Sequence, residues 1–467
     1  MDHVKSERGN NKIIHEGYIY VKQKNLARGV ISYECELRKR GKHNSGECKA
    51  KIKVMNGEVV GRTNQHTHAA VAGRPETLHV RDTMKRRALE TMEPPQQILA
   101  TCLQEISEAS ATQLPPFRTI RRAIRRTKQQ ANNPLPLPPT VNDLHIPEIY
   151  QRTTTNEQFL LYDNEDADVA RMLIFATQQD LHLLARSKHW FIDGTFKIVP
   201  GLFFQLYTIH ALHNSQIIPC VYALLPNKQE ATYTSLFQIL KNSQNELNPE
   251  SILADFEVAA LNALGAVFPD VVIQGCFFHL SQCVYRKVQN AGLQGQYNRD
   301  DALSLAARMI PAIAFVPIND VTDSFELLQE AQPEELQPIM DYFEDTFIGR
   351  PGRRNRRGPV FPLPLWNMVD RVHAGLPRTN NNIEGWHRHM DASVGCHHPS
   401  IWTFLDVLKK EQALNRINIL QIIAGEGPPP QRRIYRNITQ RLETLVAAYD
   451  NRPRLEFLRS VAHNLHM

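Results

Sequence analysis

Three acidic residues, each set in its own short sequence pattern, limit what this chain can fold into more than any other feature. Asp193 and Asp255 each close a short apolar run, residues 190–192 and 252–254, and Glu384 follows an asparagine-rich stretch. Short apolar runs are typical of buried strands, so both aspartates are expected at strand ends. Carboxylates held by neighbouring strands suit a pair of Mg²⁺ ions, which prefer oxygen ligands and can promote phosphoryl transfer. The pattern predicts cutting and joining of nucleic acid.

Each acid also has an ordinary structural explanation. An aspartate at a strand end often caps a helix, and Asp255 could cap a helix that begins near Glu257. The carboxylate of Glu257 could in turn be stabilised by the positive end of that helix's dipole. Glu257 is therefore a weaker candidate, for an accessory role at the acid site. We favour a catalytic role for Asp193, Asp255 and Glu384 because all three patterns occur in one chain.

Four segments in chain order resemble the catalytic domain of Mutator-like element (MULE) transposases, between about Lys188 and Val288. They are residues 193–196, residues 217–225, the run that ends at Asp255, and residues 274–279. Residues 361–367 and the asparagines before Glu384 are similar to the family's approach to its third carboxylate. The resemblance implies a DNA transposase with an RNase H-like fold, a catalytic Mg²⁺ or Mn²⁺, and an Asp-Asp-Glu triad at Asp193, Asp255 and Glu384.

Cys276 and His279 stand where this family carries a Cys-x-x-His pair, which implies a shared role for them. One interpretation is a second metal site, whose further ligands could come from His387, His389, Cys396, His397 and His398. The other is a structural pair, in which a buried thiol accompanies a hydrogen-bonded histidine.

Secondary-structure patterns in residues 188–299 predict an α/β core, with a mixed five-stranded sheet flanked by helices. The expected strands are 189–196, 203–212, 217–225, 251–255 and 271–276, and the expected helices are 232–242, 258–267 and 280–289. Three antiparallel strands followed by alternating helices and strands are typical of the RNase H-like fold. Residues 300–345 are expected to be helical, as an insertion before the helix that carries Glu384.

Residues 8–70 are predicted to form a separate, small β-rich domain. Residues 17–21, 30–35 and 51–54 alternate polar and apolar positions, as half-exposed strands do, and Asn56-Gly57 predicts a hairpin turn. A domain with so little apolar material usually needs a metal ion or a disulfide to fold.

Two cysteines and two histidines of this domain could bind such a metal: Cys35, Cys48, His66 and His68. Two thiolates and two imidazoles suit tetrahedral Zn²⁺. The spacing resembles that of the FLYWCH zinc finger, a module often attached to MULE transposases, although Tyr33-Glu34 departs from the usual aromatic pair before the first cysteine. The alternative is a buried pair of reduced cysteines beside two surface histidines.

The small domain is also basic, with Lys22, Lys24, Arg28, Arg38, Lys39, Arg40, Lys42, Lys49, Lys51 and Lys53. Such a surface attracts a phosphate backbone, mostly without reading its sequence. A solvated face or a protein-interaction module is the alternative. We favour double-stranded DNA as the partner, because the neighbouring domain resembles one that acts on DNA.

Two further segments are rich in arginine. The first lies in residues 71–131, where Phe117, Ile120 and Ile124 predict the apolar stripe of a helix whose other faces carry Arg118, Arg121, Arg122, Arg125 and Arg126. This helix could contact DNA, act as a nuclear-import signal or be a solvated face. The second segment contains Arg350, Arg353, Arg354, Arg356 and Arg357 and could contact the DNA backbone near the acids, or be a solvated loop.

The patterns divide the chain into a FLYWCH-type finger (8–70), a basic helical region (71–131), a proline-rich linker (132–147), a helical lead-in (148–187), the MULE/RNase H-like core (188–299), a helical insertion with the arginine-rich loop (300–375), and the third-carboxylate helix with a helical C-terminal part (376–467). No run of about 18 apolar residues predicts a membrane span. The N-terminal residues lack the apolar core of a secretory signal, and the seven cysteines are expected to be reduced or to bind metal. We expect the protein to act in the nucleus, on DNA.

The sequence therefore favours a metal-dependent DNA transposase with a structural Zn²⁺ in its finger and Mg²⁺ or Mn²⁺ at the acids; assembly into a homo-oligomer on DNA is left open. Two other classes also stay open. One is a domesticated, catalytically silent DNA-binding or regulatory protein derived from such a transposase. The other is a zinc-finger interaction protein whose C-terminal half is a scaffold.

Overall fold

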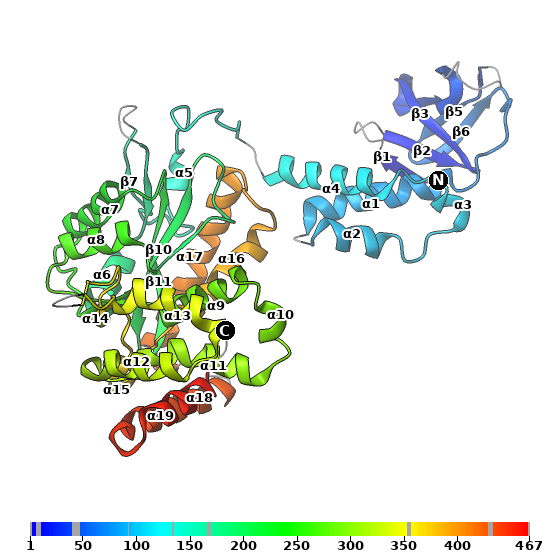
Figure 1. Cartoon of the computed structure of the whole chain (residues 1–467). Helices are drawn as coiled ribbons and strands as arrows, with labels where there is room; N and C mark the ends of the chain where they lie inside the picture. Colours follow the sequence, from blue (N-terminus) through cyan, green and yellow to red (C-terminus); the bar gives the residue numbers. More distant parts are fainter. Residues whose placement is uncertain are drawn as a thin grey trace. The chain divides into compact units, whose positions relative to one another are not determined.

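The computed structural model describes residues 2–5, 11–39, 47–91, 93–132, 135–165, 170–352, 356–427 and 433–465. The chain divides into two compact units, Met1–Pro136 and Leu137–Met467 (Figure 1). The division falls within the proline-rich stretch 132–147. The protein is of the mixed α/β class, and its N-terminal β-sheet region contains a cluster of cysteines and histidines.

The first unit begins with an antiparallel sheet whose six strands lie in chain order: β1 (Asp2–Lys5), β2 (Asn11–His15), β3 (Tyr18–Asn25), β4 (Ile31–Cys35), β5 (Lys51–Met55) and β6 (Glu58–Thr63). The turn between β5 and β6 is the predicted Asn56-Gly57, with φ of 50° and 84°. The sequence patterns predicted β3, β4 and β5. They missed β1, β2 and β6, because short strands with few apolar residues give a weak periodic signal.

Four helices complete the first unit: α1 (Arg74–Glu90), α2 (Pro95–Cys102), α3 (Glu108–Ala111) and α4 (Phe117–Asn132). Helices α1, α2 and α4 share a small core that includes Met84, Ile98, Ile120 and Ile124. The burial of Ile120 and Ile124 confirms the predicted apolar stripe of α4. Phe117, which was predicted to belong to this stripe, is instead 55% exposed, because it lies at the first residue of the helix.

The second unit contains a seven-stranded sheet in the order β13-β12-β9-β10-β11-β8-β7. The strands are β7 (Leu160–Asp163), β8 (Leu173–Phe175), β9 (His189–Thr195), β10 (Gln205–His213), β11 (Gln216–Leu225), β12 (Ser251–Ala254) and β13 (Val272–Gly275). β9, β12 and β13 pair in parallel, and the other neighbours pair antiparallel. The five predicted strands correspond to β9 to β13.

The predicted helical lead-in, residues 148–187, was wrong in part. It contains the helices α5 (Glu148–Gln151) and α6 (Gln178–Arg186), but also β7 and β8, which extend the sheet from five strands to seven. Strands of three or four residues are too short for period-two alternation to be recognised, so long-range pairing decides their conformation: β8 pairs with β11, and β7 pairs with β8. The side chains of β8 are fully buried.

The two faces of the sheet pack against different helices. Trp190 and Ile192 of β9 point into a large core with α6, α7 (Glu230–Ser243) and α8 (Val258–Val267). Successive side chains of a strand point to opposite faces, so Phe191 and Asp193 point to the other side. There Phe191 packs with Leu253 of β12 and with Ile383 of α16 (Asn381–Val394). The carboxylate of Asp193 therefore lies on the face that α16 covers.

A second, helical core lies beside the sheet. Its helices include α9 (Phe277–Asn290), α11 (Asp301–Ala312), α12 (Val321–Ala331), α13 (Gln337–Phe343), α15 (Val369–His373), α18 (Arg433–Ala447) and α19 (Arg454–Ala462). The predicted helical character of residues 300–345 is thus confirmed, and this region packs against the C-terminal helices α18 and α19. The remaining helices are α10 (Gln294–Tyr297), α14 (Leu363–Trp366) and α17 (Ile401–Ile423). Within the described ranges, no helix combines the length and apolar character needed to cross a membrane.

Candidate functional site

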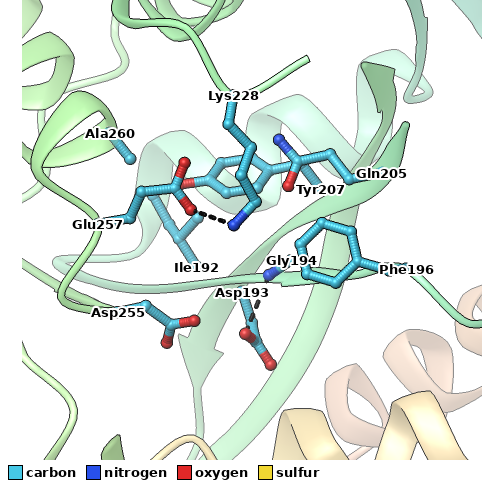
Figure 2. Close-up of a pocket in the computed structure, with 10 residues that line it drawn as sticks. All are labelled: Ile192, Asp193, Gly194, Phe196, Gln205, Tyr207, Lys228, Asp255, Glu257 and Ala260. Atoms are coloured by element: carbon cyan, nitrogen blue, oxygen red, sulfur yellow. Dashed lines mark hydrogen bonds and ion pairs between the residues drawn. The ribbon is translucent and has the colours of Figure 1, made fainter. Parts of the chain in front are cut away.

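The pairing of β9 with β12 brings Asp193 and Asp255 together. The two strands are parallel, with Phe191 opposite Leu253. Two residues further along, this register brings Asp255, the first residue after β12, level with Asp193. Phe191 and Leu253 belong to the core that faces α16, and Asp193 and Asp255 each follow one of them by two positions. Side chains two positions apart on a strand point to the same face, so both carboxylates face α16. Figure 2 shows the two carboxylates side by side.

His279 joins the two aspartates. It lies in the first turn of α9, which begins directly after β13, the parallel neighbour of β12. One ligand atom from each of Asp193, Asp255 and His279 lies within 4.8 Å of the other two. His279 Nδ1 is 2.6 Å from Asp255 Oδ1. The side chain of Asp193 is 6% exposed and that of Asp255 34%, so the group is deep but open to solvent on one side.

Glu384 and His387 come from α16, one helical turn apart. His387 Nδ1 is 3.3 Å from Asp193 Oδ2, and its other ring nitrogen is buried without a hydrogen-bond partner among the described residues. Glu384 is partly exposed on the predicted helix and interacts electrostatically with Asp193 and His279. It lies outside the 4.8 Å group that Asp193, Asp255 and His279 form.

The electrostatics of the group show a shortage of positive charge. Burial, together with the negative charge of Asp193, raises the pKa of Asp255 to about 6. Burial also raises the pKa of Glu384. Burial alone would raise the pKa of Asp193 as well, but the contact with His387 lowers it below its usual range. For His279, the ion pair with Asp255 outweighs burial and raises the pKa to about 11.

The atoms of this group fit a divalent cation. Asp255 Oδ1 and His279 Nδ1 are close, yet they lack hydrogen-bond geometry, and neither has another partner in the described part of the chain. Buried polar atoms are normally satisfied, and these two face only each other, as the ion pair that raises the pKa of His279. Two carboxylates and an imidazole are a donor set that divalent metal ions accept. A cation there would also offset the charge that raises the pKa of Asp255.

Asn380 connects the elements that carry these groups. Its side-chain amide donates to the carbonyl of Ile192, directly before Asp193 (3.1 Å), and its backbone N–H donates to Cys276 Sγ (3.2 Å). The backbone carbonyl of Asn380 accepts a hydrogen bond from the backbone N–H of Glu384 (2.9 Å). Asn380 therefore fixes β9, the start of α9 and the start of α16 to one another.

Cys276 and His279, considered together from the sequence, interact with each other, and the Cys276 thiol helps to raise the pKa of His279. Cys276 is fully buried in the apolar cluster with Phe191, Leu253 and Ile383 and is outside the ligand group, whereas His279 belongs to it. This arrangement favours a structural role for Cys276. Of the other residues named as partners, His387 contacts Asp193, whereas His389 pairs with Glu411 at 3.3 Å.

Two supporting residues escaped the sequence patterns. Asn380 stood in the asparagine-rich run, but its partners lie 188 and 104 positions away, so no local signal reveals them. Gly275 is the second: a Cβ there would lie 2.3 Å from the ring of Phe256, which follows Asp255. Only glycine at position 275 leaves room for the Phe256 ring, which belongs to the residue next to Asp255.

Glu257, the weaker accessory candidate, occupies a neighbouring position with its own partners. It accepts a hydrogen bond from the Tyr233 hydroxyl (2.6 Å). It also forms an ion pair with Lys228 (2.8 Å; Figure 2). These contacts explain Glu257 without a metal ion. With Asp193 and Asp255 it lines a small cavity of about 30 Å³.

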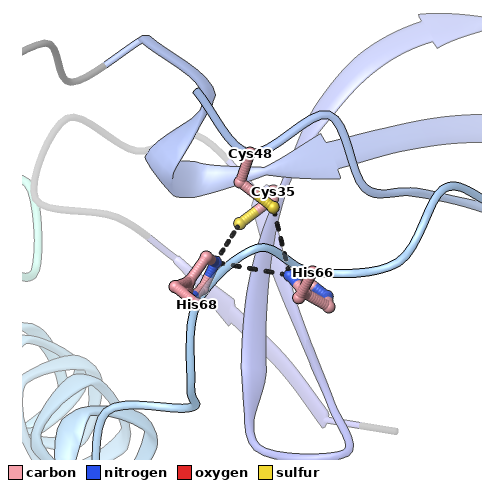
Figure 3. A group of neighbouring side chains, drawn as sticks. All are labelled: Cys35, Cys48, His66 and His68. Atoms are coloured by element: carbon pink, nitrogen blue, oxygen red, sulfur yellow. Dashed lines mark hydrogen bonds between the residues drawn. The ribbon is translucent and has the colours of Figure 1, made fainter. Parts of the chain in front are cut away.

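The four predicted zinc ligands converge in the first unit (Figure 3). Cys35 ends β4, Cys48 precedes β5, and the two histidines follow β6. Cys35 Sγ is 3.3 Å from His68 Nε2, Cys48 Sγ is 3.4 Å from His66 Nδ1, and the two nitrogens are 3.3 Å apart. Both cysteines are buried. This Cys₂His₂ cluster supports a structural zinc ion.

The outer nitrogens of both histidines also have partners. With Nδ1 of His66 facing the cysteines, its Nε2–H donates to the Tyr20 hydroxyl (2.7 Å), and His68 Nδ1–H donates to the carbonyl of Ala69 (2.8 Å). Tyr18 stacks on the His66 ring at a centroid distance of 3.6 Å. Such contacts hold a ligating imidazole in the tautomer and orientation that metal binding requires.

The predicted DNA-contacting arginines have different surroundings. Arg121, Arg122, Arg125 and Arg126 are exposed on α4. Arg356 is paired with Glu326 and Glu344, so its charge is already neutralised, whereas Arg357 is exposed. Arg353 and Arg354 lie outside the described residues.

Comparison with known families agrees with both sequence resemblances. Residues 189–283 match the MULE transposase domain, and residues 3–68 match the FLYWCH zinc finger domain. The first match spans β9 to the middle of α9 and includes Asp193, Asp255 and His279; the second includes all four cluster residues. No curated protein matches the chain. The chain therefore contains a FLYWCH zinc finger and, following it, a MULE transposase domain.

Proposed function

We propose that this protein is a metal-dependent DNA transposase of the Mutator-like type, which acts in the nucleus. The observation that carries the proposal is the convergence of Asp193, Asp255 and His279 within a matched MULE transposase domain. The strand order β11-β10-β9-β12-β13, antiparallel in its first part and parallel in its second, supports an RNase H-like core.

In this proposal the reaction is hydrolysis of a phosphodiester at an element end, followed by attack of the freed 3′ hydroxyl on target DNA. Asp193 and Asp255 would hold Mg²⁺ or Mn²⁺, with His279 adjacent and Glu384 completing a second position. Bound ions would supply Lewis acidity at the phosphate oxygens. His387 would keep the Asp193 carboxylate ionised and oriented, since it contacts Oδ2 at 3.3 Å.

The proposal is tested by strand cleavage on duplex DNA that carries the genomic sequences flanking the gene. The wild-type protein should nick the strand at the element end with Mg²⁺ or Mn²⁺, and EDTA or Ca²⁺ should suppress nicking. Sequencing of the products would locate the cut. Binding without cleavage under every metal condition would contradict transposase activity.

A catalytically silent DNA-binding or regulatory protein is the second candidate. One observation favours it: Glu384 lies outside the ligand group of the two aspartates and His279. Such a protein would bind DNA through the finger and α4 but leave it intact. The cleavage experiment separates the two candidates directly.

DNA affinity is expected to be mainly electrostatic. Replacing Arg121, Arg122, Arg125 and Arg126 of α4 by glutamine should flatten the slope of log Kd against log salt by about 0.9 for each phosphate that the protein no longer neutralises. The measurement is fluorescence anisotropy on duplex DNA between low and moderate salt. Glutamine at the exposed Arg433 and Arg436 of α18 is the matched control. An unchanged slope would show that α4 does not contact DNA. An affinity that does not depend on salt would point to a protein partner instead.

A further inference from the structure

A short loop beside the acids exposes two aromatic rings. Residues 196–204 connect β9, which carries Asp193, to β10. Ile198, Val199 and Phe203 of this loop are buried, whereas Phe196 is 40% and Phe204 50% exposed. The two exposed rings contact each other edge to face, with centroids 5.6 Å apart. The loop therefore buries Ile198, Val199 and Phe203 and presents this pair to solvent.

The backbone of the loop is held in place. The backbone N–H of His398 donates to the carbonyl of Lys197 (3.2 Å), and the ring Nδ1 of His398 lies 3.3 Å from the carbonyl oxygen of Val199. The N–H of Phe204 donates to the carbonyl of Leu225 on β11 (2.9 Å). The two rings thus form a preorganised surface, because binding a ligand would not require the loop to fold first.

The pair lies at the edge of the acid site. Phe196 lines the same small cavity as Asp193 and Asp255 (Figure 2). Lys228 places its ammonium group 4.6 Å from the centre of the Phe196 ring and is held there by Glu257. The cavity, at about 30 Å³, holds roughly one water molecule. A nucleotide would therefore stay outside it, at the rim where the rings are exposed.

We propose that Phe196 and Phe204 form a stacking platform for one unpaired nucleobase next to the phosphate that is cut. The inference rests on the proposed function, since Asp193 and Asp255 place the phosphate. An aromatic ring can stack on any base, but only after the base leaves the duplex, where its faces are already covered. The charge of Lys228 is paired with Glu257, so nucleic acid is favoured as the occupant by the phosphate that the proposed function places at Asp193 and Asp255.

The test measures binding, so that it does not depend on catalysis. Duplexes carrying one mismatched, unpaired base, moved one position at a time across the cleavage site, are bound in Ca²⁺ and followed by anisotropy. Wild-type protein should bind about 5- to 100-fold more tightly when the unpaired base is at one particular position. An abasic nucleotide there should remove the gain.

Substitutions test whether the tighter binding of an unpaired base comes from the rings of Phe196 and Phe204. Phe196→Ala and Phe204→Ala should lose the preference, Phe196→Leu should lose most of it although it stays apolar, and Phe204→Tyr should keep it. Leu414→Ala, at an exposed apolar side chain on α17, should behave as wild type. Circular dichroism checks that each variant is folded.

The results separate this inference from the proposed function. If wild-type protein cleaves but shows no preference for an unpaired base, or if the alanine variants keep the preference, the platform is wrong and the transposase stands. If the alanine variants change only the oligomeric state, the rings form an interface between copies, and the platform is again wrong. If the preference is present but cleavage never occurs, the transposase proposal fails, and the two rings stand as a binding surface for an unpaired base without a cut phosphate beside it.

Discussion

Asparagine at Asp193 or at Asp255, or glutamine at Glu384, is expected to abolish strand cleavage, lowering its rate by on the order of 10³-fold or more. Each change keeps the size of the side chain and removes the charge that holds a cation. DNA affinity should stay within about threefold, because the basic segments carry most of the binding free energy. Single-turnover cleavage and anisotropy binding, measured on the same preparations, check both statements.

Double substitutions distinguish a metal-binding unit from independent contributions. If the three acids act together, Asp193→Asn with Asp255→Asn should cost little more than either change alone. Glu257→Gln is the matched control, since Glu257 is bonded to Tyr233 and Lys228 instead of the acid group, and it should retain substantial activity. An inactive Glu257→Gln beside an active Asp255→Asn would show that the second acid has been assigned to the wrong residue.

The sequence could predict the two aspartates because their signals are local. An apolar run of three or four residues followed by a carboxylate specifies both a buried strand and the acid at its end, as β9 and β12 show. The register of Phe191 opposite Leu253, which makes the acids neighbours, depends on long-range pairing. At the level of sequence, only the family resemblance implied that the two acids meet, and the structure supplies the physical reason for it.

The environment of the third acid could not be predicted in the same way. The helix around Glu384 was expected, but its place against the sheet depends on Asn380 reaching Ile192 and Cys276. The same limit explains why Cys276 and His279 were treated as one pair. The two side chains do interact, but Cys276 is buried in an apolar cluster and only His279 reaches Asp255, a difference that only the packed sheet creates.

Removal of zinc is expected to unfold the first sheet. Its core is small, with Ile13, Tyr20, Tyr33, Ile52 and Val54 buried together, whereas a structural zinc ion contributes about 10–16 kcal/mol of apparent binding free energy at neutral pH. In the full chain, a strong chelator or Cys48→Ser should abolish amide protection in β3, β4 and β5. Hydrogen exchange measures this protection, and metal analysis should find one zinc ion bound at the cluster.

Graded variants make the zinc prediction sharper. Tyr20→Phe removes only the hydroxyl that accepts from His66, so zinc affinity should fall by about 10- to 100-fold while the sheet still folds at saturating zinc. Cys102→Ser, at a half-buried cysteine of α2 outside the cluster, should leave zinc binding unchanged. If β3 to β5 keep their protection after chelation and after Cys48→Ser, then apolar packing and hydrogen bonding alone hold the sheet, and the two cysteines are ordinary buried thiols.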